Sequence, residues 1–398
     1  MTETVLDDTS YLRALPKAEL HCHLEGSVPA ATMIELARRN GAPLPTYDAA
    51  ELYQVDIGED EFQRLAEHMP SWIGQGFARK YQRRIDTPDD FYGLAVFESF
   101  LERFDQVCGV LQTAEDFSRA AYDSLITAAD QANVRYREMF FHPMNHPGVS
   151  YRTMVDGLID GIRAAAVDRR VIGRLIPAIN RDCSAAAAAA LAQQVVSYRT
   201  DEIAGLASDY DEEHLPAFRE AYEIAAKAGL PGTAHAGEYG TAQSIAEAID
   251  ILGCTRIDHG YAITTDADLT QRAIEAGIHF TCIFSWSIAI TQPACWPLDP
   301  PALPPSRRVT SPVAAMLDAG MSISLSSDDP AFDGFGSLAD EYVWAAGSLE
   351  FDRARMTELS LAAIDGAWLD ETDKTALRQE FRNEIGTLTG TTACDSGR

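Results

Sequence analysis

The stretch KAELHCH, residues 17–23, is the first of eight short runs that are rich in strand-forming residues, and most of these runs end in polar side chains. The other seven are VRYREMFFHP (134–143), RLIPAIN (174–180), EIAGLAS (202–208), GTAHAGE (232–238), RIDHGY (256–261), HFTCIFS (279–285) and SISLSSDD (322–329). Helix-like segments, such as 216–230 and 241–253, lie between most of them. Strands that alternate with helices are typical of a parallel sheet built from βαβ units. Because eight is the number of strands in a closed barrel, we predict an α/β fold of the (β/α)8 TIM barrel class. The alternative is an open doubly wound sheet, although no glycine-rich phosphate fingerprint follows the first run.

The chain has 398 residues, a length that a single α/β barrel domain can reach. We therefore predict one domain over residues 1–398. Two stretches do not fit a minimal barrel: 53–98, a lid-like and partly helical excursion after the first strand, and 292–311, a loop dense in proline. The alanine-rich segment 184–196 is expected to be a helix, because alanine has the highest helix propensity.

The charge balance limits the classes of partner. Acidic residues number 60 and basic residues 32, which gives a formal net charge of −28. Such a surface repels phosphate backbones and anionic lipid headgroups, so we expect no nucleic-acid partner and no membrane partner. The N-terminal residues lack the basic and apolar regions of a secretory signal. Seven cysteines without paired spacing argue against a disulfide framework and predict a cytoplasmic protein. The sequence does not indicate an oligomeric state.

His21 and His23 lie at the end of the first run. Because side chains alternate along a strand, a spacing of two places both imidazole rings on one face. Such a pair suits a borderline-soft divalent metal ion. An H-x-H pair alone is weak evidence, since a packed or exposed pair of histidines is the more frequent explanation.

Other chemically active side chains also fall at strand ends. His235 and Glu238 lie near the end of the fifth run, His259 ends the sixth, and Asp328 and Asp329 close the eighth. Each has an ordinary explanation by itself: a buried histidine, a surface glutamate or a solvated acidic turn. In a barrel, however, the carboxyl ends of the strands form one face, where active sites lie. Taken together, these residues predict a single catalytic site.

Four segments, ELHCHLEGS, TAHAGE, RIDHGY and SSDDP, resemble the signature blocks of the adenosine/adenine deaminase family, and they occur in the family's order. The resemblance runs from about residue 16 to about residue 385. It implies a barrel enzyme that holds one zinc ion per chain, with iron or manganese as alternatives. The residues it implies as metal ligands are three histidines and one aspartate: His21, His23, His235 and Asp328.

The same resemblance implies the roles of three further residues. Glu238 would give a proton to the ring nitrogen beside the reacting carbon, His259 would help to deprotonate and orient the attacking water, and Asp329 would bind the imidazole side of a purine. The expected reaction converts a 6-aminopurine to the 6-oxo product and ammonia. The chemistry is consistent with these roles, because a ring that accepts hydroxide needs a protonated nitrogen to take up the charge.

Several positions depart from the pattern of the adenosine enzymes. Glu25 follows His-Leu where many of them carry an aspartate that contacts the sugar, and Ser208 stands where they usually have a glycine near the purine. The seventh run ends CIFSWS, whereas C-P-x-S-N is frequent in the family. Glu25, together with RIDHG, SDDPAF and REMFFHP, favours adenine over adenosine, whereas the changes at Ser208 and in CIFSWS leave the exact substrate open. Glu25, Ser208 and Asp329 are the predicted substrate-binding residues. A modified adenine or another amino-heterocycle is the alternative substrate.

Three other classes of protein are alternatives to this prediction. Cytidine-type deaminases require a P-C-x-x-C motif, which is absent. Barrel hydrolases that cleave amides or esters typically use two metals and a bridging lysine, but no strand run between Phe140 and Asp329 contains a lysine. A non-catalytic binding protein on the same barrel is the third alternative, and the presence of all the expected ligands and of Glu238 argues against it.

Overall fold

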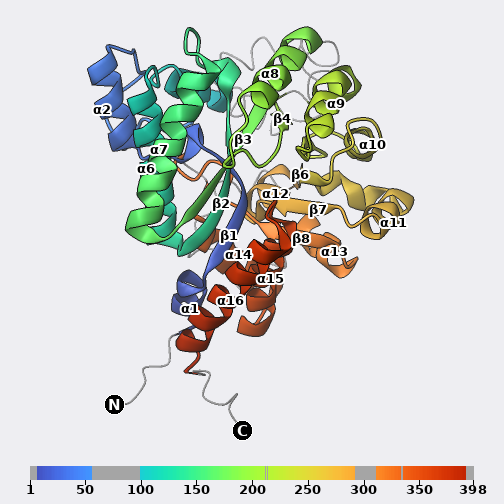
Figure 1. The fold of residues 1–398 in the computed structure, drawn as a ribbon. Coiled ribbons are helices and arrows are strands. Elements are labelled where there is room, and N and C mark those ends of the chain that lie inside the picture. The colour runs from blue at the N-terminus through green and yellow to red at the C-terminus, as the bar shows by residue number, and fades with distance from the viewer. Residues whose placement is uncertain are drawn as a thin grey trace, which may run out of the picture.

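The computed structural model describes residues 7–55, 99–210, 212, 214–291, 311–332 and 335–390, and its strands form a parallel barrel surrounded by helices (Figure 1). The first four strands are β1 (Lys17–His23), β2 (Val134–Phe141), β3 (Ile172–Asn180) and β4 (Ala207–Asp209). The second four are β5 (His235–Ala236), β6 (Arg256–His259), β7 (His279–Cys282) and β8 (Ser322–Leu325). The predicted α/β barrel is confirmed.

Two four-stranded sheets make up the barrel, ordered β1-β2-β3-β4 and β5-β6-β7-β8, with every neighbouring pair parallel. Single parallel bridges connect the two sheets at both edges. One joins Leu206 to Gly232, and the other joins Cys22 to Asp328. The second bridge places the residues after β8 directly beside the carboxyl end of β1.

The helices follow the strands along the chain and surround the barrel (Figure 1). In the first half they are α1 (Asp8–Ala14), α2 (Ala30–Asn40), α6 (Ala114–Ala132), α7 (Tyr151–Arg169), α8 (Ala185–Ser197) and α9 (Arg219–Lys227). In the second half they are α10 (Ala242–Asp250), α11 (Ala267–Glu275), α12 (Phe284–Thr291), α13 (Pro312–Asp318), α14 (Leu338–Leu349), α15 (Arg353–Gly366) and α16 (Glu371–Leu388). A 3₁₀ turn, η1 (Glu25–Ser27), follows β1.

Local sequence explains where several of these helices begin. The Ser184 side chain accepts a hydrogen bond from the Ala187 amide, which satisfies one of the free donors at the start of α8. The predicted alanine-rich helix is thus confirmed. Helix α6 begins with a reciprocal capping box between Thr113 and Asp116.

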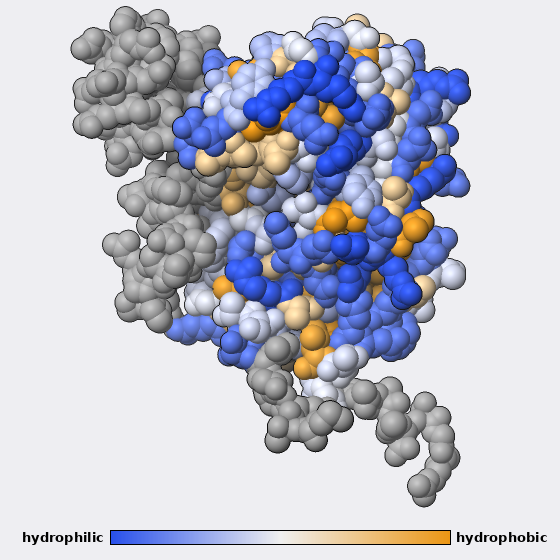
Figure 2. All heavy atoms as spheres, turned by 90° about the vertical axis from the view of Figure 1, so that its left-hand side faces the viewer, coloured by the Kyte–Doolittle hydropathy of each residue, from blue (hydrophilic) through white to orange (hydrophobic). Residues whose placement is uncertain are grey.

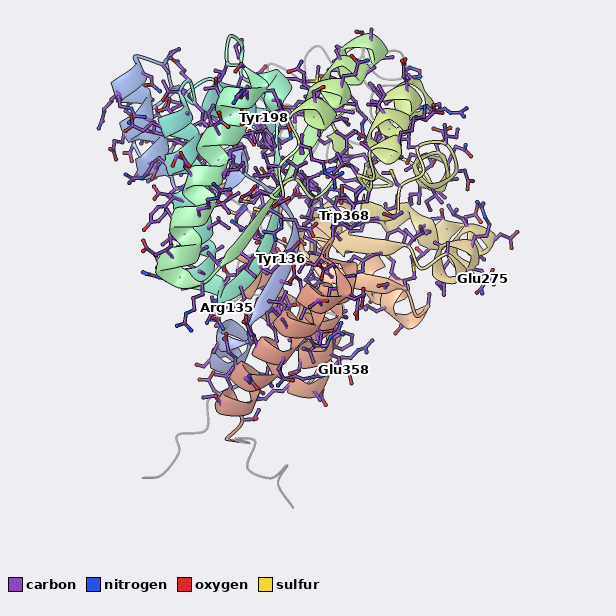
Figure 3. The ribbon with its side chains drawn as sticks, viewed as in Figure 1. Arg135, Tyr136, Tyr198, Glu275, Glu358 and Trp368 are labelled. Atoms are coloured by element: carbon purple, nitrogen blue, oxygen red, sulfur yellow. The ribbon has the colours of Figure 1, made fainter. Side chains whose placement is uncertain are left out.

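Charged side chains lie buried inside the barrel towards its amino-terminal end. Arg256, the first residue of β6, donates to Glu138 at 2.5 Å, and its guanidinium group lies 3.7 Å from the centre of the Trp368 ring. Tyr136 also donates to Glu138, at 2.6 Å. In Figure 3, Tyr136 and Trp368 lie at the strands, whereas Glu275 and Glu358 extend outwards from helices. This network fills the barrel interior and leaves the carboxyl ends of the strands for a pocket.

Two predicted features lie mostly outside the described residues. Of the 53–98 excursion only residues 53–55 are described, and of the 292–311 loop only Ser311. The face shown in Figure 2 carries mainly hydrophilic residues with smaller hydrophobic patches. Within the described ranges, no helix has the length and apolar character needed to cross a membrane. The five described cysteines are all free.

Candidate active site

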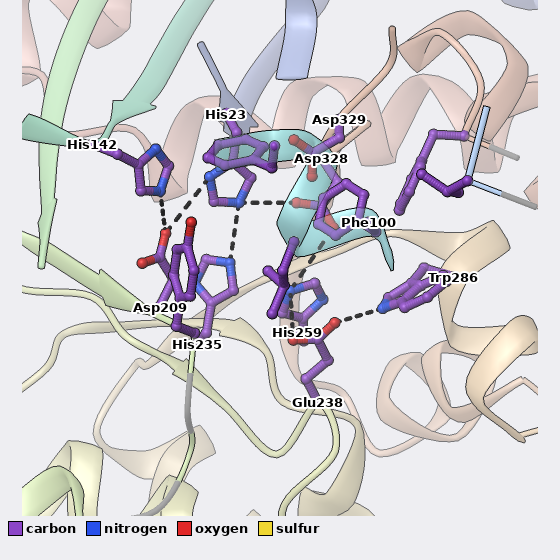
Figure 4. Close-up of a pocket in the computed structure, with 15 residues that line it drawn as sticks. His23, Phe100, His142, Asp209, His235, Glu238, His259, Trp286, Asp328 and Asp329 are labelled. Carbon is purple, nitrogen blue, oxygen red and sulfur yellow. Dashed lines mark hydrogen bonds and ion pairs between the residues drawn. The ribbon is translucent and has the colours of Figure 1, made fainter. Parts of the chain in front are cut away.

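Imidazole rings and a carboxylate converge at the carboxyl ends of β1, β5, β6 and β8. Ligand atoms of His21, His235, His259 and Asp328 lie within 4.8 Å of one another, and a ligand atom of His23 lies within the same distance of Asp328. Figure 4 shows His23, His235, His259 and Asp328 at this point of the pocket. The Nε2 atoms of His21 and His23 lie 3.0 and 3.1 Å from Oδ1 of Asp328. The Nε2 atoms of His23 and His235 are 3.2 Å apart. All four side chains are buried. The structure therefore brings together the four residues that the resemblance implied as metal ligands.

Asp258 orients two of these rings through their Nδ1 atoms. It accepts a hydrogen bond from the Thr281 hydroxyl at 2.9 Å, and Thr281 Oγ1 in turn lies 3.1 Å from Nδ1 of His21. The other oxygen of Asp258 lies 3.3 Å from Nδ1 of His235. Because the Thr281 proton points to Asp258, the hydroxyl accepts from His21 Nδ1–H. His21 therefore presents an Nε2 lone pair to the cluster.

The cluster has the chemistry of a divalent metal site. Nε2 of His21 and Oδ1 of Asp328 are buried and 3.0 Å apart, but neither has a partner among the described residues in a geometry that makes a hydrogen bond. Donors around a tetrahedral ion with bonds of about 2 Å lie roughly 3.3 Å apart, which is close to the observed spacings. Three nitrogens and one carboxylate oxygen form a donor set that suits zinc and related ions. The residues present fit a divalent metal.

His259 ends β6 beside this cluster and is held as a neutral ring. Its Nδ1 lies 3.2 Å from the hydroxyl of Tyr261, which donates to the Ile283 carbonyl at 3.0 Å. The hydroxyl proton is thereby used, so Tyr261 accepts from His259 Nδ1–H and Nε2 keeps its lone pair. Burial and the neighbouring His21 lower the pKa of His259 well below its usual range. His259 can accept a proton at Nε2, which lies 4.0 Å from Asp328.

The backbone at His259 and Asp328 is left-handed, with φ angles of 64° and 62°. This conformation is unfavourable for residues other than glycine and concentrates at functional sites. The barrel thus holds two of the predicted site residues in a backbone state that neither would adopt freely.

Glu238 lies two residues after β5 and faces His259. Its Oε2 atom is 3.5 Å from Nε2 of His259, and its Oε1 atom accepts a hydrogen bond from Trp286 Nε1 at 2.5 Å (Figure 4). Burial and the nearby Asp328 carboxylate raise the pKa of Glu238 well above its usual range. These surroundings favour the protonated form of Glu238.

The loop that carries Glu238 is fixed by the buried carboxylate of Glu212. Four consecutive backbone amides, from Gly237 to Gly240, donate to its two oxygens at 2.6–3.2 Å. The Ser244 hydroxyl donates as well, at 3.0 Å. A carboxylate that accepts several backbone donors defines the loop conformation. Glu212 thus positions Glu238.

Asp329 lines the pocket beside η1. Its Oδ1 atom is buried and has no hydrogen-bond partner among the described residues. A Cβ atom on Gly26 would lie 1.7 Å from that oxygen, so the carboxylate occupies space that only glycine leaves free. Burial and the adjacent Asp328 raise the pKa of Asp329 well above its usual range. This position suits the predicted contact with a ring nitrogen.

The pocket that contains these groups has a polar floor and an apolar wall (Figure 4). The wall is formed by Val55, Phe100, Leu101, Phe104, Trp286 and Phe335. Among the described lining residues there is no lysine and no arginine. A flat heterocycle could lie between this wall and the cluster of histidines.

A sequence model of the family described as Adenosine deaminase matches residues 85–384. The chain belongs to the adenosine deaminase family. It is a hydrolase that acts on C–N bonds.

Individual relatives support this family assignment. The adenine deaminase of Streptomyces coelicolor is 32% identical over 94% of this chain and 96% of its own. The adenine deaminase of Chlorobium phaeobacteroides is 29% identical over 92% of this chain and 95% of its own. Among solved structures, the adenine deaminase of Arthrobacter aurescens has a TM-score of 0.72 at 28% identity and covers 93% of this chain and 99% of its own. An amidohydrolase from Burkholderia ambifaria with bound zinc has a TM-score of 0.77 at 29% identity and covers 99% of this chain and 97% of its own.

Two residues predicted to bind substrate in this deaminase, Glu25 and Ser208, are not among the pocket-lining residues. The Glu25 carboxylate lies 3.0 Å from Nδ1 of His142 and 2.9 Å from Nε2 of His146. The Ser208 hydroxyl donates to that of Tyr222 at 2.8 Å, because the single proton of Tyr222 goes to the Thr233 carbonyl at 2.6 Å. Both side chains are fully buried. Their direct contact with substrate stays a prediction, and the positions observed here favour an indirect role.

The sequence reasoning missed His142 and Asp209, which line the deaminase pocket between Glu25 and His23. His142 Nε2 contacts the Asp209 carboxylate, and that carboxylate lies 3.7 Å from Nδ1 of His23. Burial lowers the pKa of His142, but Asp209 and Glu25 together raise it well above its usual range. The two carboxylates thus favour the protonated form of His142 and hold its ring behind a predicted metal ligand. Its place at the end of the second run was the signal that could have identified it.

Proposed function

We propose that this chain is a zinc-dependent hydrolytic deaminase that converts a 6-aminopurine to the 6-oxopurine and ammonia, with one zinc ion per chain. The observation that carries the proposal is the convergence of three Nε2 atoms and the Asp328 carboxylate beside the partly buried carboxyl group of Glu238. A metal site alone fits many hydrolases. Glu238 adds a carboxyl group whose surroundings favour its protonated form, next to the same site. Such a group suits nucleophilic attack on an aromatic ring, because a ring nitrogen must accept a proton during that attack.

The side chains divide the reaction between them. When bound, the metal ion acts as a Lewis acid that makes a nucleophile from water at neutral pH. His259 accepts a proton at Nε2. Glu238 gives its proton to the ring nitrogen next to the reacting carbon, so that the ring accommodates the incoming electron pair. Asp329 binds the imidazole side of the purine and sets its position over the cluster.

Within this class we propose adenine, or a close relative of it, as the substrate. The curated relatives with 29–32% identity carry the name adenine deaminase. The described wall of the pocket is apolar, and the described lining residues include no lysine and no arginine that could bind a nucleotide phosphate. An uncharged base with a small or apolar substituent suits such a wall.

The experiment is ammonia release by the zinc-loaded protein with adenine, adenosine, deoxyadenosine, AMP, N6-substituted adenines, cytosine and guanine. Glu238→Gln is the matched control, because it keeps the shape of the side chain and removes its acidic proton. We expect turnover of adenine or an N6-substituted adenine and a loss of roughly 100-fold or more in the control. Zinc-loaded protein that releases no ammonia from any aminopurine would refute the proposal.

A further inference from the structure

Trp286 is a pocket residue to which the family resemblance gives no role. It lies in CIFSWS, where the sequence departs from the frequent C-P-x-S-N, and it is the third residue of α12. Its indole ring is part of the apolar wall, and its Nε1 atom points to Glu238 (Figure 4). This departure from the family pattern therefore places the indole N–H of Trp286 against Glu238, the residue that we expect to give a proton to the substrate.

The contact fixes which oxygen of Glu238 can carry the proton. An indole N–H is a donor only, so Oε1, at 2.5 Å from Nε1, must accept from it. The acidic proton of Glu238 is then carried by Oε2, the oxygen that lies 3.5 Å from His259. Without the indole, the carboxyl group could rotate and exchange the two oxygens.

The backbone before Trp286 is held in place on both sides. The Ser285 amide donates to Glu341 of α14 at 3.0 Å, and the Ser285 hydroxyl also donates to that carboxylate. The Ile283 amide donates to the hydroxyl of Tyr261 at 3.2 Å. The indole ring itself packs against Phe335, with ring centres 5.3 Å apart. Such a supported donor can define the geometry of the group it contacts.

We propose that Trp286 is a positioning residue for Glu238, an inference that rests on the proposed deaminase function. Its indole N–H holds Oε1 so that Oε2 delivers the proton to the ring nitrogen. In that step the O–H bond of Glu238 breaks, an N–H bond forms on the ring, and the electron pair stays on the carboxylate. The indole N–H continues to donate to Oε1 and stabilises the charge that forms there.

The kinetic test is Trp286→Phe, which keeps an aromatic ring in the wall and removes the donor. We expect kcat to fall roughly 10- to 100-fold, the range that a hydrogen bond to a charged group supports, while KM changes little. The matched control is Trp344→Phe, a buried tryptophan of α14 that does not line the pocket. We expect it to keep the kcat of the unaltered protein. An unchanged kcat in Trp286→Phe overturns the proposal.

A double variant separates positioning from simple packing. If Trp286 acts through Glu238, adding Trp286→Phe to Glu238→Gln has no further effect on the residual rate, because the proton donor is already lost. If Trp286 only packs against the substrate, its effect persists in the Glu238→Gln background, and the proposal fails.

A spectroscopic readout keeps this inference distinct from the deaminase function. In protein labelled with ¹⁵N-tryptophan, the indole resonance that disappears in Trp286→Phe belongs to Trp286. We expect that resonance to shift strongly in Glu238→Ala, whereas the resonance of Trp344 stays in place. If the chemical shift of the Trp286 indole is the same in Glu238→Ala as in the unaltered protein, the inference is overturned, even if the protein deaminates adenine. Absence of deamination by the unaltered protein counts against the proposed function instead, and the resonance still reports the contact.

Discussion

Every hydrogen-bonding position of the Tyr261 hydroxyl is used in the structure. It donates to the carbonyl of Ile283, accepts from the amide of Ile283, and accepts from Nδ1–H of His259. A phenol has one proton and two acceptor positions, so no other arrangement satisfies all three contacts. The tautomer of His259 is thus set by a residue two positions further along the chain.

We predict that Tyr261→Phe lowers kcat roughly 10- to 100-fold with a smaller change in KM, because His259 loses the partner that fixes its tautomer. Steady-state kinetics on the best substrate of the panel measures the effect. Tyr198→Phe is the matched control, since Tyr198 bonds to Asp156 on the outside of the protein. Equal kcat values for Tyr261→Phe and the control would contradict the role assigned to Tyr261.

We predict that Asp258→Asn weakens zinc binding by roughly 10- to 100-fold, the range found when a partner behind a metal-binding histidine is removed. The substitution keeps the shape of the side chain and removes the charge that faces His235 and, through Thr281, His21. Zinc content after dialysis against graded chelator concentrations measures the effect without an activity assay. Asp250→Asn is the control, because Asp250 pairs with Arg272 on the surface. Equal zinc retention in the two variants would contradict the prediction.

Asp258 also shows where prediction from sequence ends. It stands next to His259 in RIDHGY, one of the segments that resemble the deaminase family. Its role, however, depends on Thr281 and His235, which lie on other strands. Residues at strand ends could be predicted to meet, because parallel strands share one edge. The partners behind them depend on the register between strands, which the sequence pattern does not specify.

At the scale of elements, the approach of η1 to the residues after β8 shapes the substrate side of the pocket. The amide of Ala331 donates to the carbonyl of Gly26 at 2.9 Å, so the two segments are joined by backbone. The Asp329 carboxylate lies against the Gly26 Cα atom, in the space that a side chain would fill. Neither segment can move away without breaking this contact.

We predict that Gly26→Ala lowers kcat/KM roughly 10- to 100-fold, because the added methyl group must displace the Asp329 carboxylate and a shift of about 1 Å can cost that much. Gly347→Ala is a matched control: a Cβ there has no heavy atom within 4 Å, and the position lies inside α14. We expect the control to keep full activity and to be slightly more stable, since alanine favours helix. Wild-type kcat/KM in Gly26→Ala would show that Asp329 does not set the position of the substrate.

The fourth strand is the element that the sequence predicted least well. The predicted run was 202–208, whereas regular β4 spans Ala207–Asp209. Ile203 and Leu206 make only single bridges, to Leu175 and Gly232, so the run is extended but not continuously paired. Hydrophobic and β-branched residues indicate burial in the barrel wall. They do not indicate whether both neighbouring strands come close enough to form a ladder.

For the whole molecule, the alternation of strand-like and helix-like segments was sufficient to predict the barrel. The eight runs each contain, or overlap, one of the eight observed strands. The active face followed from this topology, because the chemically active side chains occur at the carboxyl ends of β1, β5, β6 and β8, which lie on one face of the barrel. The segments 56–98 and 292–310 lie outside the described residues, so the predicted lid-like excursion and most of the proline-rich loop stay predictions.

The net charge of −28 gives a prediction for stability. Like charges distributed over one compact body repel, and the repulsion is lost when the chain unfolds and expands. Salt screens it, since the Debye length falls from about 30 Å at 0.01 M to about 8 Å at 0.15 M. Salt also weakens exposed ion pairs, such as Arg272–Asp250, but each of these contributes only about 0–1 kcal/mol. Repulsion should therefore be the larger of the two effects.

We predict that the Tm at pH 7.5 rises by a few degrees when NaCl is raised from about 10 to about 300 mM, a range that includes about 0.15 M. The measurement is made with excess chelator, so that metal occupancy does not vary. The matched control is the same titration near pH 4.6, the isoelectric point, where the net charge is close to zero. There the repulsion that salt could screen is absent, so the Tm should stay constant or fall as ion pairs weaken. A Tm that falls with salt at both pH values would mean that paired surface charges outweigh the net repulsion, and that the acidic surface is organised into stabilising networks.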